Sequence, residues 1–99
     1  MGLQETMRAL ADPTRREILE LVRDRPLPAG EIAAHFAGSG AAVSRHRSVL
    51  REAGLCRAQR AGTYIYYQAD LSVVEELLPW ATGLTGQEVA APQGEEVEG

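Results

Sequence analysis

The amino-acid sequence predicts one small domain that is mainly α-helical, with about five helices and a single β-hairpin. Apolar side chains recur three and four residues apart in several short segments, which is the pattern of amphipathic helices. Between residues 55 and 68, β-forming residues instead flank Gly62, which favours a hairpin. The chain has 99 residues, enough for one domain. A domain of this size buries only about 60–65% of its unfolded surface, so we expect a dimer to bury more.

Two short helices are predicted at the N-terminus. Leu3, Met7 and Leu10 recur at i, i+4 and i+7, which indicates a helix with a narrow apolar stripe within the first ten residues. Asp12 is a favoured N-cap residue and Pro13 suits the first helical position, so a second helix is expected to begin there. We expect this second helix to end in the segment 23–26.

The third and fourth helices are predicted to form a helix-turn-helix unit. Pro28 is expected to open the third helix, which would stop at Gly38. Only Gly38-Ser39-Gly40 links it to the next helix, so the two must cross steeply. The fourth helix is expected to end at about Ala53, because Gly54 suits a left-handed helix stop. Its predicted core face consists of Val43, His46, Val49, Leu50 and Ala53.

The other side of the fourth helix has the character of a surface for an anionic partner. Short side chains near its start let the backbone come close, and the side chains of Ser44, Arg45 and Ser48 can reach base edges or phosphates. The turn of the hairpin, predicted over residues 60–63, adds a cation that suits a minor groove. We therefore expect double-stranded DNA as a partner. The expected contacts are Ser39, Ala41, Ala42, Ser44, Arg45, Arg47, Ser48, Arg51, Arg60 and Thr63.

A last helix is predicted after Asp70, a plausible N-cap, with Pro79 marking a kink or a restart. Its apolar stripe is too wide for one small core, so we expect it to form a two-fold dimer interface with the first helix. The expected interface residues are Leu3, Met7, Leu10, Val74, Leu77, Leu78, Trp80 and Ala81. Residues 1–84 would form the DNA-binding and dimerisation domain, and residues 85–99 a disordered acidic tail.

The charge is distributed unevenly along the chain. The net charge is −4, yet residues 39–70 carry five arginines against Glu52 and Asp70, a local +3. Four glutamates and no basic residue follow Thr85. All ten basic residues are arginines, which favours bidentate contacts with phosphate and guanine. The distribution, rather than the overall sign, supports binding to DNA.

Four helices, a hairpin and a last helix follow the order of a winged helix-turn-helix dimer. Over about residues 3–84 the chain resembles the ArsR family of bacterial repressors, and more finely its SdpR-like autorepressor branch. The family likeness lies in Leu10–Leu19, Ala42–His46 and Glu52–Leu55, and the finer one in Ala29–Ile32, Tyr64–Tyr67 and the helix containing Trp80. The resemblance implies a homodimeric repressor on a pseudo-palindromic operator. In it the recognition helix enters the major groove and the hairpin, or wing, reaches the adjacent minor groove.

We make separate predictions for His46 and Arg47, which both lie within the segment that resembles the family. His46 resembles a family histidine that packs between helices, so a structural hydrogen bond is expected there. At Arg47 relatives usually carry leucine. Its side chain is expected either to extend from the core edge towards phosphate or to weaken the domain.

Other functions find little support in the sequence. No metal or other cofactor is expected, because Pro28 and Gly30 stand where metal-sensing relatives carry cysteines, and the last helix contains no histidine. An enzyme is not expected, since no phosphate loop or catalytic constellation is present.

Cys56 is the single cysteine and is expected to be a buried apolar residue. Without a secretion signal or an apolar run of about 20 residues, a cytoplasmic protein with no membrane insertion is expected. The alternative is a protein-interaction module on the same fold, controlled by sequestration through a partner protein.

Overall fold

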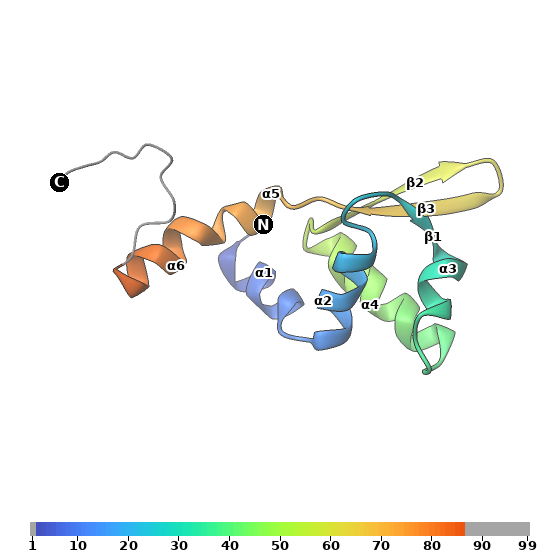
Figure 1. Cartoon of the computed structure of the whole chain (residues 1–99), viewed down its shortest axis with the longest axis horizontal. Helices are drawn as coiled ribbons and strands as arrows, with labels where there is room; N and C mark the ends of the chain where they lie inside the picture. The colour runs from blue at the N-terminus through green and yellow to red at the C-terminus, as the bar shows by residue number, and fades with distance from the viewer. Residues whose placement is uncertain (1, 87–99) are drawn as a thin grey trace.

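A computed structural model describes residues 2–86, in which a helical body carries the hairpin at one end and the last helix at the other (Figure 1). The helices and strands are α1 (Leu3–Leu10), α2 (Pro13–Leu21), β1 (Leu27–Pro28), α3 (Ala29–Ala34), α4 (Gly40–Glu52), β2 (Cys56–Ala61), β3 (Tyr64–Ala69), α5 (Ser72–Glu75) and α6 (Leu77–Thr85). The predicted class, mainly helical with a β-hairpin wing, is confirmed.

The helix ends follow the capping residues that the sequence supplies. The Asp12 carboxylate accepts hydrogen bonds from the backbone N–H of Thr14 at 2.7 Å and of Arg15 at 3.2 Å, so α2 begins where predicted. Ser39 Oγ accepts from the Ala42 N–H at 3.1 Å and caps α4. At the other end of α4, Gly54 has a φ of 77° and the Leu55 N–H donates to the Leu50 carbonyl at 2.9 Å. These caps fix the length and the start of α4, the predicted recognition helix.

The core lies between α2, α3, α4 and the inner face of the sheet. Ile18, Val22, Ile32, Leu50 and Leu55 are its largest fully buried side chains. Val43 and Leu50 of α4 and its C-cap residue Ala53 are buried, while His46 and Val49 are half-buried, as the apolar spacing predicted. The packing therefore holds α4 by one side and leaves its other side at the surface.

The sheet has three antiparallel strands in the order β1-β3-β2. Tyr67 lies in the central strand, opposite Leu27 on one side and Ala58 on the other, and only 6% of its surface is exposed. The sequence analysis missed β1, because two residues are too few to show an alternating pattern. This short strand joins the segment before α3 to the base of the wing.

Two boundaries differ from the prediction. The third helix ends at Ala34 and not at Gly38, because the chain turns so that Phe36 packs against the core. The hairpin turn is shorter than expected: β2 reaches Ala61 and β3 begins at Tyr64, with Gly62 at a φ of 65°. Arg60 consequently lies within β2, paired with Ile65, and Thr63 lies in the turn.

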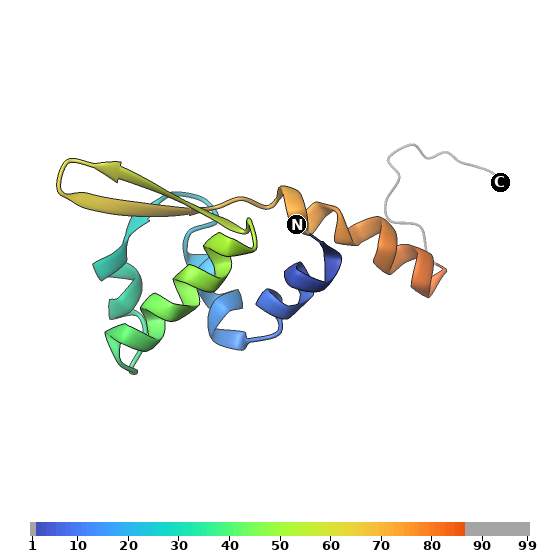
Figure 2. The same cartoon turned by 180° about the vertical axis from the view of Figure 1, so that it is seen from behind.

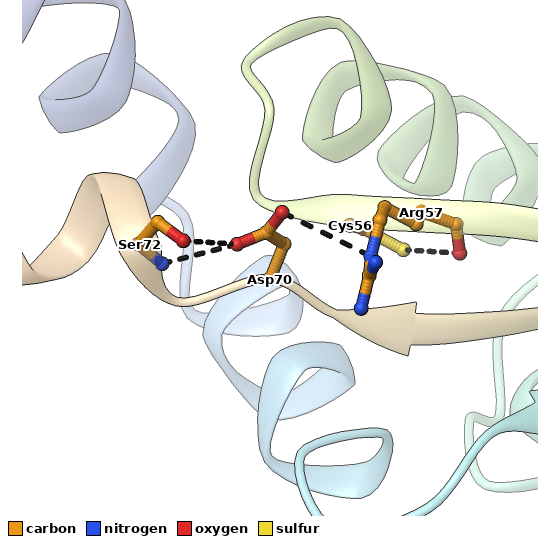
Figure 3. A network of polar contacts seen from close by, with 4 residues as sticks. All are labelled: Cys56, Arg57, Asp70 and Ser72. Atoms are coloured by element: carbon orange, nitrogen blue, oxygen red, sulfur yellow. Dashed lines mark hydrogen bonds and ion pairs between the residues drawn. The ribbon is translucent and has the colours of Figure 1, made fainter.

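The last helix is divided at Glu76 into α5 and α6. Pro79 explains the position of the break, because its missing N–H and its ring disfavour continuous helix at the carbonyl four residues earlier, that of Glu75. The expected restart is confirmed. Asp70, the expected cap, stands one residue before the N-cap position of α5, which Leu71 occupies. Its Oδ1 nevertheless accepts hydrogen bonds from the Ser72 N–H and hydroxyl at 3.1 and 2.7 Å, and Oδ2 faces Arg57 Nε at 3.8 Å (Figure 3). Asp70 therefore ties the base of the wing to α5.

The predicted acidic tail lies outside the described residues, apart from its first two positions. Within residues 2–86, α6 continues to Thr85 and ends on Gly86 with a left-handed φ of 76°. No helix in this part of the chain is both long enough and apolar enough to cross a bilayer.

Candidate nucleic-acid interface

The surface side of α4 brings together most of the predicted contact residues. In Figure 2, α4 runs along the near face of the helical body with no other element in front of it. Ala41, Ser44, Arg45, Ser48 and Arg51 are exposed, as is the N-cap residue Ser39, and Ala42 is half-buried. Because Ala41, Ser44, Arg45 and Ser48 are three or four residues apart, they lie on one helix face. This face presents two hydroxyls and an arginine beside a small side chain that allows close approach.

Two arginines that follow Asp12 hold α1 against the body. Arg15 Nε donates to the Ala9 carbonyl at 2.6 Å and Nη2 to the Arg8 carbonyl at 3.0 Å, while Arg16 Nη1 donates to the Leu10 carbonyl at 2.6 Å. The last carbonyls of a helix have no partner within it, so these guanidinium groups satisfy the C-terminus of α1.

Arg15 also contacts α4 directly. Its Nη1 lies 3.3 Å from His46 Nδ1. A guanidinium can only donate, so Nδ1 is the acceptor in this contact. The expected structural hydrogen bond of His46 is confirmed, and it links the junction of α1 and α2 to the recognition helix. The arginine partner was not predicted, because the two residues are 31 positions apart.

Arg47 is directed differently from its neighbours. It is half-buried, and its guanidinium carbon lies 4.7 Å from the centroid of the Tyr67 ring. Its Nε is buried and has no hydrogen-bond partner in the described part of the chain. One of the two expectations for Arg47 was a side chain that extends from the core edge towards phosphate. The structure shows the side chain at the core edge, but its guanidinium stacks on Tyr67 of the wing.

The wing presents its residues on two faces. Arg60 and Ile65, like Ala58 and Tyr67, form a cross-strand pair on the side that faces α4. On the opposite face Gln59 pairs with Tyr66 and Ala61 with Tyr64, and the two tyrosine rings meet edge to face at 6.5 Å. Arg60 and Thr63 are both exposed, near the end of the wing that lies furthest from α6 (Figure 1).

The arginines of this region are not equally available. Within residues 2–86, Arg45, Arg51 and Arg60 form no hydrogen bond or ion pair with the protein, so their charges are free for a ligand. Arg57 faces Asp70, and Arg47 stacks on Tyr67. The charge pattern counts these five arginines equally, but in the structure three have no partner among the described residues and two contact other side chains.

Among the residues described, no three His, Cys, Asp or Glu side chains are grouped so that they could hold a metal ion. Cys56 is 3% exposed, as expected for a buried apolar residue. Burial raises the pKa of its thiol, which keeps it in the less reactive protonated form.

The comparisons with known proteins agree with this geometry. Residues 10–57 match the family description "Helix-turn-helix domain". The chain is 35% identical over 78 residues to the transcriptional repressor SdpR of Bacillus subtilis, which covers 79% of this chain and 87% of that protein. It is 41% identical over 83 residues to the HTH-type transcriptional regulator Rv2034 of Mycobacterium tuberculosis, over 79% of this chain and 78% of the relative.

A solved structure supports the same assignment. An ArsR-like transcriptional regulator from Rhodococcus sp. RHA1 superposes with a TM-score of 0.80 at 25% identity, over 85% of this chain and 77% of that one. The relatives are transcriptional regulators and not enzymes, and the fold has the recognition helix and the wing of a DNA-binding protein. The chain belongs to the ArsR family of winged helix-turn-helix transcriptional regulators.

Proposed function

We propose that this DNA-binding regulator is a homodimeric repressor that binds a pseudo-palindromic operator without a metal effector. The observation that carries the proposal is the exposed face of α4, where Ser44, Arg45 and Ser48 share one side of a helix whose other side is held in the core. In a dimer, two such helices about 34 Å apart would enter successive major grooves.

The proposed contacts divide by chemistry. Arg45 would read a base edge, where a bidentate arginine discriminates guanine, and the hydroxyls of Ser44 and Ser48 would bond to bases or phosphates. Arg51 would contact the backbone near the end of α4. Arg60 and Thr63 of the wing would reach the adjacent minor groove, whose negative potential favours arginine. Ser39, Ala41 and Ala42 would permit close approach of the helix start.

The dimer rests on apolar side chains that the single chain leaves uncovered. Leu3 and Met7 of α1 are 38% and 41% exposed, and Leu78 and Trp80 of α6 are 48% and 45% exposed. No charged residue occurs in α6. A helix that is apolar on all sides requires burial. A two-fold pairing of α1 and α6 would supply it and would include the half-buried Leu10, Val74, Leu77 and Ala81.

The test is binding of labelled duplexes selected from the DNA upstream of the protein's own gene. We expect sequence-dependent affinity that falls steeply with salt, and a stoichiometry of two chains per duplex. A duplex with one half-site destroyed should bind much more weakly. Zinc, nickel or chelator should leave the affinity unchanged. No preference for any selected sequence over random DNA would refute the proposed function.

A control variant separates specific contact from general charge. Arg45→Ala and Arg25→Ala each remove one exposed arginine, but Arg25 lies in the segment between α2 and β1 and not on α4. Only the first should abolish sequence preference. Equal losses for the two variants would show that the reading face is misplaced.

A further inference from the structure

The contact between Arg47 and Tyr67 joins the two elements that meet DNA in the proposed function. Arg47 belongs to α4, and Tyr67 belongs to the central strand of the sheet that carries the wing. The guanidinium carbon lies 4.7 Å from the ring centroid, which is within the range of a cation–π interaction of about 6 Å. Tyr67 is only 6% exposed, so the ring itself is fixed by its surroundings.

The guanidinium of Arg47 lies against the Tyr67 ring and not in solvent. Its Nε is buried without a hydrogen-bond partner among the described residues, and a buried polar N–H group is costly unless something compensates it. The aromatic face is the compensation that the structure provides, and a cation–π contact strengthens as water is excluded. An arginine whose function was to reach phosphate would instead keep its whole head in solvent, as exposed Arg45 and Arg51 do.

The position of Tyr67 in the sheet connects this contact to the wing. Tyr67 pairs with Ala58, and Arg60 lies two residues further along β2, about 7 Å towards the turn. Because alternate residues share a face, the Tyr67 ring and the Arg60 side chain lie on the same side of the sheet. A change in the angle between α4 and the sheet at Tyr67 therefore displaces Arg60.

We propose that Arg47 is a positioning residue: by stacking on Tyr67 it sets the angle between α4 and the wing, so that Arg45 and Arg60 engage one operator together. This proposal rests on the proposed function. It assigns to Arg47 a role within the protein in place of the direct DNA contact that the sequence suggested.

The two roles differ in what happens when Arg47 and Arg60 are changed together. Residues that contact phosphate independently give additive losses, whereas a residue that positions another gives strongly non-additive ones. A direct phosphate contact also lowers the slope of log K against log salt by about 0.9 for each contact removed. A positioning residue changes that slope only through the wing.

The experiment is a double-mutant cycle on the full chain, measured as affinity for a selected operator. Arg47→Leu should weaken binding roughly tenfold, and Arg60→Ala by a similar factor. Combined, they should weaken binding hardly more than either does alone. Arg51→Leu is the matched control on the same helix, and its effect should add fully to that of Arg60→Ala. Additive losses for Arg47 and Arg60 would overturn the proposal.

Substitutions of Tyr67 provide a second test of the positioning role of Arg47. Tyr67→Phe keeps the aromatic face and should bind like the unchanged protein, while Tyr67→Leu should reproduce the loss seen with Arg47→Leu. Circular dichroism identifies variants that fail to fold. If Arg47→Leu is one of them, Arg47→Met, which retains a long apolar stem, takes its place in the cycle. A Tyr67→Leu protein that folds and binds normally would contradict the positioning role.

A measurement without DNA separates this proposal from the proposed function. In the free protein, the side-chain protons of Arg47 should show an upfield ring-current shift in the NMR spectrum, retained in Tyr67→Phe and lost in Tyr67→Leu. Absence of that shift would overturn the contact itself. Absence of operator binding by the unchanged protein would refute the proposed function, while additive losses with intact binding would overturn only the positioning role.

Discussion

Replacing Leu78 with glutamate is the sharpest test of the proposed dimer. Leu78 is already 48% exposed in the single chain, so a carboxylate there keeps access to water in a monomer. Leu77 is less suitable, because it is half-buried beside Leu3 and Trp80 and its replacement would disturb the packing of α6 on α1. The proposed interface predicts that Leu78→Glu damages association and leaves the monomer folded.

The expected magnitude follows from the two-fold symmetry. An unpaired charge buried in an apolar interface costs roughly 3–5 kcal/mol. The dimer would contain two such charges, so the cost of association is roughly 6–10 kcal/mol. Since about 1.4 kcal/mol changes a dissociation constant tenfold, the constant for the dimer should rise by at least about 10⁴. At micromolar concentrations, Leu78→Glu should therefore be monomeric.

Sedimentation equilibrium measures the association, and circular dichroism checks that the helix content is unchanged. Gln59→Glu is the matched control, because it adds the same charge at an exposed position of β2 on the wing, at the other end of the molecule from α6 (Figure 1). The control should remain dimeric. An intact Leu78→Glu dimer with full operator affinity would show that the interface lies elsewhere.

Three further predictions concern single residues. Arg45→Ala should cost about 2–6 kcal/mol of operator affinity per dimer, measured by anisotropy; an unchanged affinity would refute the reading role. Arg15→Met should lower the free energy of unfolding by roughly 2–3 kcal/mol in urea titrations, because it removes the charged bonds to α1 and His46; an unchanged midpoint would contradict this. The Ser72 hydrogen bonds lower the pKa of Asp70. For Asp12, desolvation is the largest single effect and raises the pKa, but the Arg15 and Thr14 N–H bonds and nearby positive charge together outweigh it and lower the pKa. The ionised carboxylates of Asp12 and Asp70 therefore stabilise the folded protein above the ordinary pKa of 3.8, and this stabilisation is lost as the pH falls below it. Asparagine at either position should make the free energy of unfolding fall less between neutral and acidic pH.

The helices and the hairpin were predictable because their signals are local. Asp12 with Pro13, and Gly54, each determine a helix boundary within a few residues, and those boundaries were predicted closely. The signal at Pro79 was local too: it predicted a kink or a restart of the last helix, and the structure has a restart at Leu77. The exposed face of α4 followed from helical spacing alone, since the apolar residues fix which side is buried.

The interactions that orient these elements were not predictable in the same way. The bond between Arg15 and His46 and the stacking of Arg47 on Tyr67 each join residues that are distant in sequence. An arginine with a long, flexible side chain shows no sequence pattern that reveals which way it points. The third helix was predicted too long for a related reason, because packing of Phe36 on the core decides where it ends.

The number of arginines in the sequence likewise does not show how many of them are available to DNA. The salt dependence of operator affinity measures that number. If every arginine between residues 39 and 70 placed its charge against the DNA, a dimer would bring ten cations to it, and the slope of log K against log salt would be about −9. In the fold, Arg57 faces Asp70 at 3.8 Å and Arg47 stacks on Tyr67, which leaves three of these five arginines in each chain without a partner among the described residues. Six contacts give a slope of about −5. Operator affinity measured across a salt series decides between the two, and a slope near −9 would show that Arg47 and Arg57 also meet the DNA when it binds.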